Sequence, residues 1–327
     1  MKRVFRQVKL WTLAALLLAG CSTETALQKL LGVSAAAPVF YGCHAAENGQ
    51  VEFRFSVPVT IKSVYFDRVV ELESRTEGET VSIVIAGDLP PGTLINMDML
   101  VEDKRGNTLN VLVPFRTRNN RMPALLVNEL RLTATKPKTE FVELRAMGAG
   151  NLGALRLFAA NKMGKIPLFE FPPVEIQAGE YIVVHTRDYP NESGHVNETE
   201  GLNKSSGTDA LRSARDFWVP GTTKLLYDTD AIYLCDQDDR VIDAVVFAAN
   251  GKKQNEDVTA AITFLAGQEA WNSAEISDAA DSTGHTATRT VNRVRAGTDT
   301  NSAGDWFVGA TSTASPGAVN TANRYYP

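Results

Sequence analysis

Histidine and carboxylate side chains collect in the polar stretch 188–217, where such a mixture could coordinate a cation. Three glutamates lie within a few positions of His195: Glu192, Glu198 and Glu200. His185 and Asp188 come just before them, at the end of an apolar run that predicts a strand. The stretch lacks the fixed glycine and the ordered carboxylates of a calcium loop. We therefore favour a hydrated, charged loop over a metal site.

A second acidic run, Asp236-Gln237-Asp238-Asp239, also has a composition that could suit calcium. Arg240 occupies the position where a further oxygen ligand would be needed. Apolar runs at 231–234 and 241–247 flank the acidic residues, and this arrangement predicts two strands joined by a hairpin turn. The hairpin explains the run, so we predict no calcium site.

Catalytic patterns are missing as well. No serine lies in a Gly-x-Ser-x-Gly elbow, and the serines near His285 have no evident orienting carboxylate. Glu140 and Glu143 point to opposite faces of an expected strand, so they cannot act together as acid and base. His44 adjoins Cys43, but no second pair follows at zinc-ligand spacing. We predict that the protein is not an enzyme and uses no metal or cofactor.

The first twenty residues form a unit of their own. Four basic residues open it: Lys2, Arg3, Arg6 and Lys9. The apolar run from Trp11 to Leu18 is far shorter than the roughly 20 residues that span a bilayer, which indicates a secretory signal peptide. The junction Leu18-Ala19-Gly20-Cys21 resembles the bacterial lipobox, and this resemblance implies acylation of Cys21 and attachment to membrane lipid. Ser22 favours sorting to an outer membrane.

The predicted mature chain, which begins at Cys21, is acidic and has two further cysteines. Cleavage before Cys21 removes four basic residues and leaves 29 Lys plus Arg against 38 Asp plus Glu, a net charge of −9. An acidic surface repels phosphate backbones, so we predict no nucleic-acid partner. Residues 21–37 are polar and Ala-rich and are predicted to be a tether. In an oxidising compartment Cys43 and Cys235 could form a disulfide or remain two buried thiols.

Residues 38–118 carry the alternation of a β-sandwich. Val51, Phe53, Phe55 and Val57 alternate with polar residues, which places them on one face of a strand. Further strands are predicted at 63–71, 80–86, 95–102 and 108–115. Three ordered motifs stand between or within these strands: Phe55–Val59, Leu89–Thr93 and Asp103–Asn107. Together they resemble a bacterial Ig-like domain of the surface-layer type.

From Pro123 onward the chain carries a second ordered series of motifs, after a short basic linker at 116–122. It opens with the apolar segment 123–131, which contains Asn128-Glu129, and the acidic-aromatic segment 140–144. Further motifs follow in order: Leu155–Phe158, Val174–Glu180, Tyr181–Val184, Ala231–Leu234, Val241–Phe247, Arg289, Asp305-Trp306 and Ser315–Asn320. Over residues 123–320 this series resembles a lamin-tail domain, a small immunoglobulin-like sandwich. Two positions depart from that pattern, Ala154 after Gly153 and Asp239 in the hairpin.

The lamin-tail resemblance implies structural roles for six residues. Asn128, Glu129 and Glu143 are expected to satisfy backbone or arginine groups inside the sandwich, with Arg289 as the candidate cation. A buried carboxylate needs such partners, since an unpaired charge in a core is costly. Asp305 and Trp306 are expected to close the core.

Two insertions distinguish the second domain (123–327), at 188–217 and 250–288. In the second, four residues share one helical face, with Asp257 as a possible N-cap: Val258, Ala261, Ile262 and Leu265. The first is either a contact surface on a rigid scaffold or a solvated excursion. Phe217-Trp218 at its end is predicted to pack on the sandwich.

These observations predict a mainly β protein of two tandem immunoglobulin-like β-sandwiches, the second with loop and short helical insertions. We expect a lipid-anchored, extracytoplasmic protein at the outer membrane or cell surface, with a non-catalytic binding or scaffolding role toward a protein or glycan. Lamin-tail domains often accompany secreted hydrolases, so the alternative is a targeting or accessory subunit of one. A third interpretation is a structural spacer.

Overall fold

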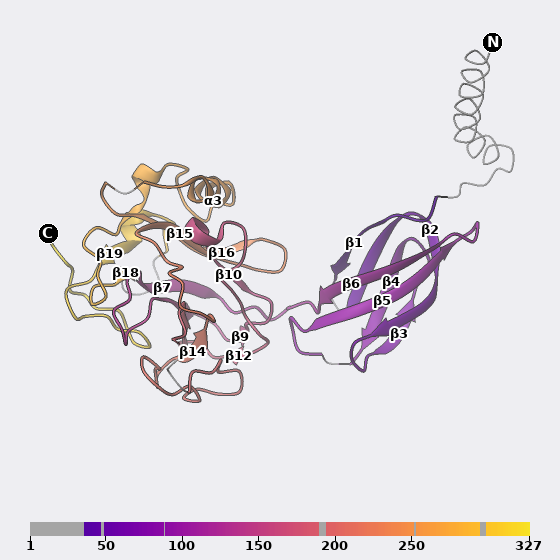
Figure 1. The fold of residues 1–327 in the computed structure, drawn as a ribbon, viewed down its shortest axis with the longest axis horizontal. Coiled ribbons are helices and arrows are strands. Elements are labelled where there is room, and N and C mark those ends of the chain that lie inside the picture. The colour runs from indigo at the N-terminus through magenta and orange to yellow at the C-terminus, as the bar shows by residue number, and fades with distance from the viewer. Residues whose placement is uncertain (1–35, 47–48, 88, 190–193, 252, 295–298) are drawn as a thin grey trace, which may run out of the picture. The chain divides into compact units, whose positions relative to one another are not determined.

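The structure is a computed structural model that describes residues 36–46, 49–87, 89–189, 194–251, 253–294 and 299–327. The signal peptide, Cys21 and most of the tether lie outside the described residues. The chain divides into two compact units (Figure 1), the first with residues 36–87 and 94–115, and the second with 89–93 and 116–327. None of the helices in the described ranges has the length and apolar character needed to cross a bilayer. Both units are built mainly from strands, so the predicted mainly β fold class is confirmed.

The first unit is a six-stranded sheet in the order β3-β4-β2-β5-β6, with β1 paired to β2. Its strands are β1 (Phe40–Ala45), β2 (Gln50–Phe66), β3 (Glu71–Arg75), β4 (Gly78–Ala86), β5 (Leu94–Asp103) and β6 (Thr108–Arg116). The first half of β2 pairs with β1 and β4, and its second half pairs with β5. Phe53 on β2 meets Phe115 on β6 edge to face, with ring centroids 6.2 Å apart, so the two halves of the sheet enclose one core.

The separate strands predicted at 51–57 and 63–71 are one continuous strand to Phe66, which is a correction. Register shifts between Arg54 and Val59 and between Ile61 and Ser63 absorb the bend. Pro58 has no N–H to donate, and it lies within the first shift, where the ladder is interrupted. The proline therefore bends the strand without ending it.

The second unit packs two main sheets around one core. One sheet has the order β14-β13-β8-β7-β18-β19, and the other has β11-β10-β15-β16-β17. The strands of the first are β7 (Leu125–Arg131), β8 (Phe141–Ala146), β13 (Tyr181–His185), β14 (Arg215–Trp218), β18 (Val291–Arg293) and β19 (Trp306–Val308). Those of the second are β10 (Arg156–Ala159), β11 (Phe169–Glu170), β15 (Thr229–Cys235), β16 (Val241–Ala248) and β17 (Ala280–Asp281). Short strands β9 (Gly150–Asn151) and β12 (Glu175–Ile176) pair with each other.

Helix α3 (Glu256–Gly267) covers part of the second sheet beside β15 and β16, as Figure 1 shows. The four residues predicted to share its apolar face are all buried, which confirms that prediction. All seven residues of β15 are buried, because one face lies on the core and the other is covered, for example where Tyr233 meets Phe264. The N-cap is Asn255 rather than Asp257: Asn255 Oδ1 accepts a hydrogen bond of 2.9 Å from the Val258 amide. Asp257 lies in the first turn, where a negative charge favours the helix dipole.

The remaining short elements are helix α2 (Ala160–Met163) and the 3-10 helices η1 (Ile276–Asp278) and η2 (Ala303–Asp305). Cys43 lies in the first unit and Cys235 in the second, and each is a free thiol within its own unit. Cys43 is half-buried and Cys235 is buried. Burial raises the pKa of both thiols, that of Cys235 to about 12, which keeps its sulfur protonated and unreactive.

Candidate functional site

The first insertion connects two neighbouring parallel strands. β13 pairs with β14 in parallel, from Ile182 opposite Arg215 to His185 opposite Trp218. Parallel neighbours need a long crossover, and the residues between His185 and Arg215 provide it. The predicted excursion 188–217 therefore ends in a strand of its own, β14, which forms the edge of the sheet. Phe217 and Trp218 are buried, so their predicted packing on the sandwich is confirmed.

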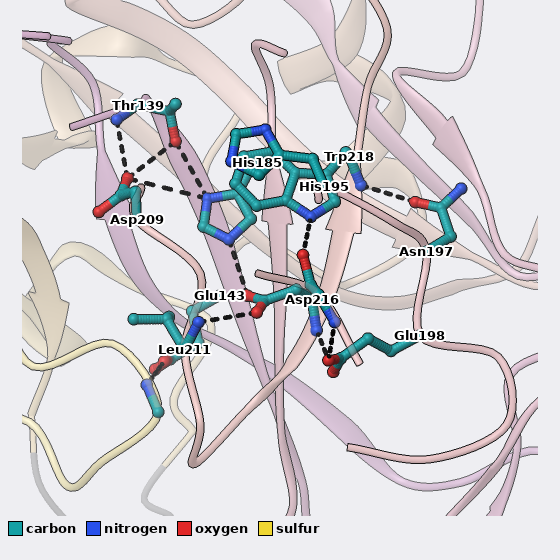
Figure 2. A network of polar contacts seen from close by, with 12 residues as sticks. Thr139, Glu143, His185, His195, Asn197, Glu198, Asp209, Leu211, Asp216 and Trp218 are labelled. Carbon is teal, nitrogen blue, oxygen red and sulfur yellow. Dashed lines mark hydrogen bonds and ion pairs between the residues drawn. The ribbon is translucent and has the colours of Figure 1, made fainter. Parts of the chain in front are cut away.

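Trp218 lies between two imidazole rings (Figure 2). Its indole is stacked on His185 with ring centroids 3.9 Å apart, and on His195 with centroids 3.6 Å apart. The indole N–H donates a hydrogen bond of 3.0 Å to Ser205 Oγ. Both ring faces and the polar edge of Trp218 are thus satisfied, and the indole fixes one end of the insertion to the sheet.

Glu198 organises the middle of the insertion although its side chain is fully buried. Its carboxylate accepts the backbone amides of Lys204 at 2.6 Å and Ser205 at 2.8 Å on one oxygen, and that of Asp216 at 3.0 Å on the other. Hydrogen bonds from backbone N–H to a carboxylate are among the stronger ones in proteins. Arg215 Nη1 also donates to the Glu198 carbonyl at 2.6 Å. One buried carboxylate therefore holds three separated amides together.

His195 uses both ring nitrogens within the insertion. Nδ1 lies 2.9 Å from Asp188 Oδ1, and Nε2 lies 3.1 Å from the Thr208 carbonyl oxygen. Both partners are acceptors, so each ring nitrogen faces an oxygen of the insertion. Of the glutamates considered as co-ligands, Glu200 is exposed and Glu192 lies outside the described residues. Across the described ranges, no three His, Cys, Asp or Glu side chains are placed to hold a metal ion.

His185 joins Asp216 and Thr139 in a row that has the order of a catalytic triad. Its Nε2 lies 2.8 Å from Asp216 Oδ1, and its Nδ1 lies 3.0 Å from Thr139 Oγ1. All three residues are completely buried. A nucleophile must be reached by its substrate, and the Thr139 hydroxyl is instead within 3.0 Å of Asp209. The row therefore ties strand β14 to strand β13 and to the segment that leads into β8.

Asp209 anchors the far side of the insertion to the sheet. Its carboxylate accepts the Thr139 amide at 2.8 Å and pairs with Arg131 Nη1 at 3.1 Å. Arg131 is itself buried and lies over the Phe141 ring, 4.6 Å from its centroid. Sequence reasoning missed Thr139, Asp209 and Arg131, because residues separated by 70 or more positions share no local spacing signal.

The buried carboxylates that the sequence singled out lie in the core. Glu143 Oε1 accepts Asn128 Nδ2 at 2.6 Å, and its Oε2 accepts the Gly317 amide at 2.5 Å. Glu129 accepts the Thr290 hydroxyl at 2.5 Å and the Ser315 amide at 3.1 Å. Burial raises the pKa of both carboxyls, and for Glu143 the neighbouring Glu129 raises the pKa further. Their partners are hydroxyl, amide and backbone groups.

Arg289 is not among those partners, which corrects the expected role of that residue. Its guanidinium donates to the Gly284 carbonyl at 3.1 Å and lies 4.1 Å above the Tyr325 ring. The backbone amides of Ser315 and Gly317 donate to these carboxylates instead, which is the backbone alternative of that prediction. The buried arginine of this region is Arg293, which pairs with Asp243 at 2.6 Å.

Asp305 and Trp306 close the sandwich beside Arg293. The Asp305 carboxylate accepts the Thr300 amide and hydroxyl, each at 2.8 Å, and forms a capping box with Ser302 at the start of η2. Trp306 is buried at the start of β19, with Arg293 4.7 Å from its ring centroid. Asp305 thus fixes the loop from which β19 enters the sheet.

The acidic run at 236–239 forms the predicted hairpin turn between β15 and β16. Asp236 Oδ1 accepts the amides of Asp238 at 2.8 Å and Arg240 at 3.0 Å. Asp238 pairs with Arg118, and Asp239 pairs with Arg156 at 2.9 Å. These carboxylates are engaged in the turn and in ion pairs, so the run has a structural explanation.

The outer surface of the insertion differs from its interior. Val196 is 45% exposed and Leu202 is 40% exposed, although both belong to a segment rich in polar residues. The polar side chains of Glu198, Ser205 and Asp209 are directed inward in the bonds described above. A loop that is fixed from inside presents an outer surface of constant shape, which is what recognition requires.

Comparison with known proteins gives a family and one relative. The family model TP_1001_2nd, described as a protein second domain, matches residues 123–308, more than half of the chain. A protein of Treponema pallidum (strain Nichols), named as an uncharacterized protein, is 29% identical over 115 residues. That alignment covers 34% of this chain and 29% of the Treponema protein, so the chain spans under a third of that relative. No solved structure matches the chain.

Proposed function

This chain belongs to the TP_1001_2nd family, and we propose that it is a lipid-anchored protein of the cell envelope that binds a protein or glycan partner without catalysing a reaction. The first insertion of the second unit, residues 188–217, is the proposed contact surface.

The buried Glu198 carboxylate is the observation that carries this proposal. A solvated excursion would leave its backbone amides to water, whereas here three amides converge on one fully buried side chain. Burying a carboxylate is costly unless donors surround it. That cost is offset only if the insertion keeps one conformation, and a preorganised loop loses less entropy when it binds.

The lipid anchor is supported by sequence features. The basic start, the short apolar run and the Leu18-Ala19-Gly20-Cys21 junction favour export and acylation at Cys21. One acyl chain holds a protein to a membrane only marginally, and two or three hold it firmly. Metabolic labelling with a palmitate analogue should mark the wild-type chain and leave Cys21→Ala unlabelled and unattached to membranes. A Cys21→Ala chain that still partitions with membranes would contradict the anchor.

Site-specific photo-crosslinking in intact cells tests the contact surface. A photoreactive residue at position 196 or 202 should give a discrete adduct with one partner. The matched control is position 166, because Ile166 is 64% exposed in the same unit but lies outside the insertion. The adduct should disappear when Glu198→Ala is added, since that change releases the loop.

The outcomes also separate the alternatives. A secreted hydrolase as the captured partner would favour the accessory-subunit interpretation, and the chain would still be a binding protein. Equal adducts at positions 166, 196 and 202 would reject the insertion as the contact surface. If no adduct forms at position 196 or 202 and the protein is still attached to the membrane, the structural-spacer interpretation would be favoured.

A further inference from the structure

The first unit carries a groove that the proposed function does not use. It has a volume of about 380 Å³ and lies beside the second half of β2, β5 and β6. Its lining includes Tyr65, Asp67, Asn96, Asp98, Leu112 and Pro114. Tyr65 is 68% exposed and Leu112 is 74% exposed, so both side chains are accessible to a partner.

Tyr65 and Asp98 are direct neighbours in this groove. They are register partners on antiparallel strands β2 and β5, so their side chains leave the same face of the sheet about 5 Å apart. An aromatic face and a carboxylate side by side both attract a cation, the ring through its quadrupole and the carboxylate through its negative charge. The two residues thus form the charged end of the groove.

The carboxylate of Asp98 differs from the others nearby because it has no hydrogen-bond or ion-pair partner among the described residues. Glu102 on the same strand pairs with Lys62 at 2.8 Å. Asp67 accepts the amide and side chain of Asn96 at 3.1 and 2.7 Å, and these donors lower the pKa of its carboxyl. Asp67 also pairs with Arg68 at 3.4 Å, so the negative charge available to a ligand in this groove is that of Asp98.

We propose that this groove is a second binding site, which receives an arginine side chain of a partner protein. The guanidinium lies over the Tyr65 ring and bonds to the Asp98 carboxylate, while its aliphatic stem covers Leu112 and Pro114. Arginine fits better than lysine because its planar guanidinium both stacks on an aromatic ring and bonds a carboxylate. The charge of the mature chain favours the approach of such a partner. The site is independent of the insertion in the second unit.

The test uses the full chain in detergent and a fluorescent heptapeptide, Gly-Arg-Gly-Arg-Gly-Arg-Gly. Its matched control replaces each arginine with citrulline, which keeps the shape of the side chain and removes the charge. Fluorescence anisotropy should show binding of the arginine peptide, at least tenfold weaker binding of the citrulline peptide, and weaker binding at higher salt.

Variants then locate the site. Asp98→Asn and Tyr65→Ala should each weaken binding of the arginine peptide about fivefold. Tyr41→Ala should leave it unchanged, because Tyr41 is 65% exposed in the same unit but does not line the groove. Circular dichroism and melting curves confirm that each variant is folded. Tyr65→Phe keeps the ring and should bind like the wild type.

Three results would overturn the proposal. Equal binding of the citrulline peptide would show that charge is not recognised. Unchanged binding by Asp98→Asn and Tyr65→Ala would place the peptide elsewhere on the acidic surface. No binding of the arginine peptide, together with Tyr65-dependent binding of a neutral oligosaccharide, would make the groove a glycan site.

Discussion

The indole N–H of Trp218 donates to the hydroxyl of Ser205, 13 residues earlier in the chain, over 3.0 Å. Ser205 in turn presents its backbone amide to the buried Glu198 carboxylate at 2.8 Å. A single serine thus connects the edge strand of the sheet with the carboxylate at the centre of the insertion. The order of the loop depends on this connection more than on any exposed residue.

Replacement of Glu198 by alanine should loosen the insertion without unfolding the protein. Three amides would lose their acceptor, at a cost of about 1 to 3 kcal/mol for each that stays buried. Amide hydrogen exchange at residues 204, 205 and 216 should become at least tenfold faster, while exchange in β15 stays unchanged. Glu200→Ala is the control, since Glu200 is an exposed glutamate of the same loop. Equal protection in both variants would show that Glu198 does not organise the insertion.

Asp230 should make the stability of the second unit depend on pH. Its carboxyl is fully buried, and desolvation raises its pKa to about 7 from an ordinary 3.8. The folded state then binds the proton more tightly than the unfolded chain does. The contribution of Asp230 to the free energy of unfolding is therefore greatest below pH 4 and falls as the pH rises toward 7. Across this range the free energy of unfolding should fall by at most about 4 kcal/mol.

Urea unfolding between pH 4 and pH 8 measures the effect for Asp230. The variant Asp230→Asn cannot ionise, so its free energy of unfolding should vary less across this range than that of the wild type. Asp230 Oδ1 accepts the Asn161 amide at 2.7 Å, and asparagine keeps that acceptor. Parallel pH profiles for the two proteins would contradict the raised pKa.

Glu143→Ala and Arg289→Ala should differ in their effects on stability. Loss of Glu143 leaves the amide groups of Asn128 and Gly317 without their acceptor in the core, which should cost about 3 kcal/mol. Loss of Arg289 removes one carbonyl bond and one ring contact, worth about 1 kcal/mol. Thermal melting curves compare them directly. A larger loss of thermal stability for Arg289→Ala than for Glu143→Ala would support Arg289 as the cation that stabilises the buried carboxylates.

Ala154→Gly should stabilise the second unit. Ala154 has φ of 62°, a conformation in which the Cβ atom of an L residue is strained. Glycine adopts this conformation freely. The substitution should raise the free energy of unfolding by about 0.5 to 1 kcal/mol, after the entropy cost of a more flexible unfolded chain. The melting temperature reports the change. Ala160→Gly, in helix α2, serves as the opposite control and should destabilise.

The sequence predicted what depends on local periodicity. The face of helix α3 and the hairpin at 236–239 follow from spacing within a few residues, and both were correct. The N-cap was misplaced by two residues because Asn255 and Asp257 are both good caps, and only the course of the chain decides between them. Two strands were predicted where β2 runs through Pro58 as one strand, because a β-bulge has no residue signature of its own.

The polar network could not be predicted in the same way. His185, Thr139 and Asp216 come from separate segments, and their contacts depend on how strand β14 returns beside β13. The histidines and acids were noticed from composition, but composition does not tell whether a carboxylate faces water or a backbone amide. Arg289 was assigned to the carboxylates through the lamin-tail resemblance, and the backbone donors were expected only as a class, because the amide of Gly317 carries no side-chain signal.

The amides of Ser315 and Gly317 complete the surroundings of two carboxylates that originate almost two hundred positions earlier, Glu129 and Glu143. During synthesis these acids emerge long before the segment that satisfies them. These two buried carboxylates therefore lack part of their donor set until Gly317 has been made.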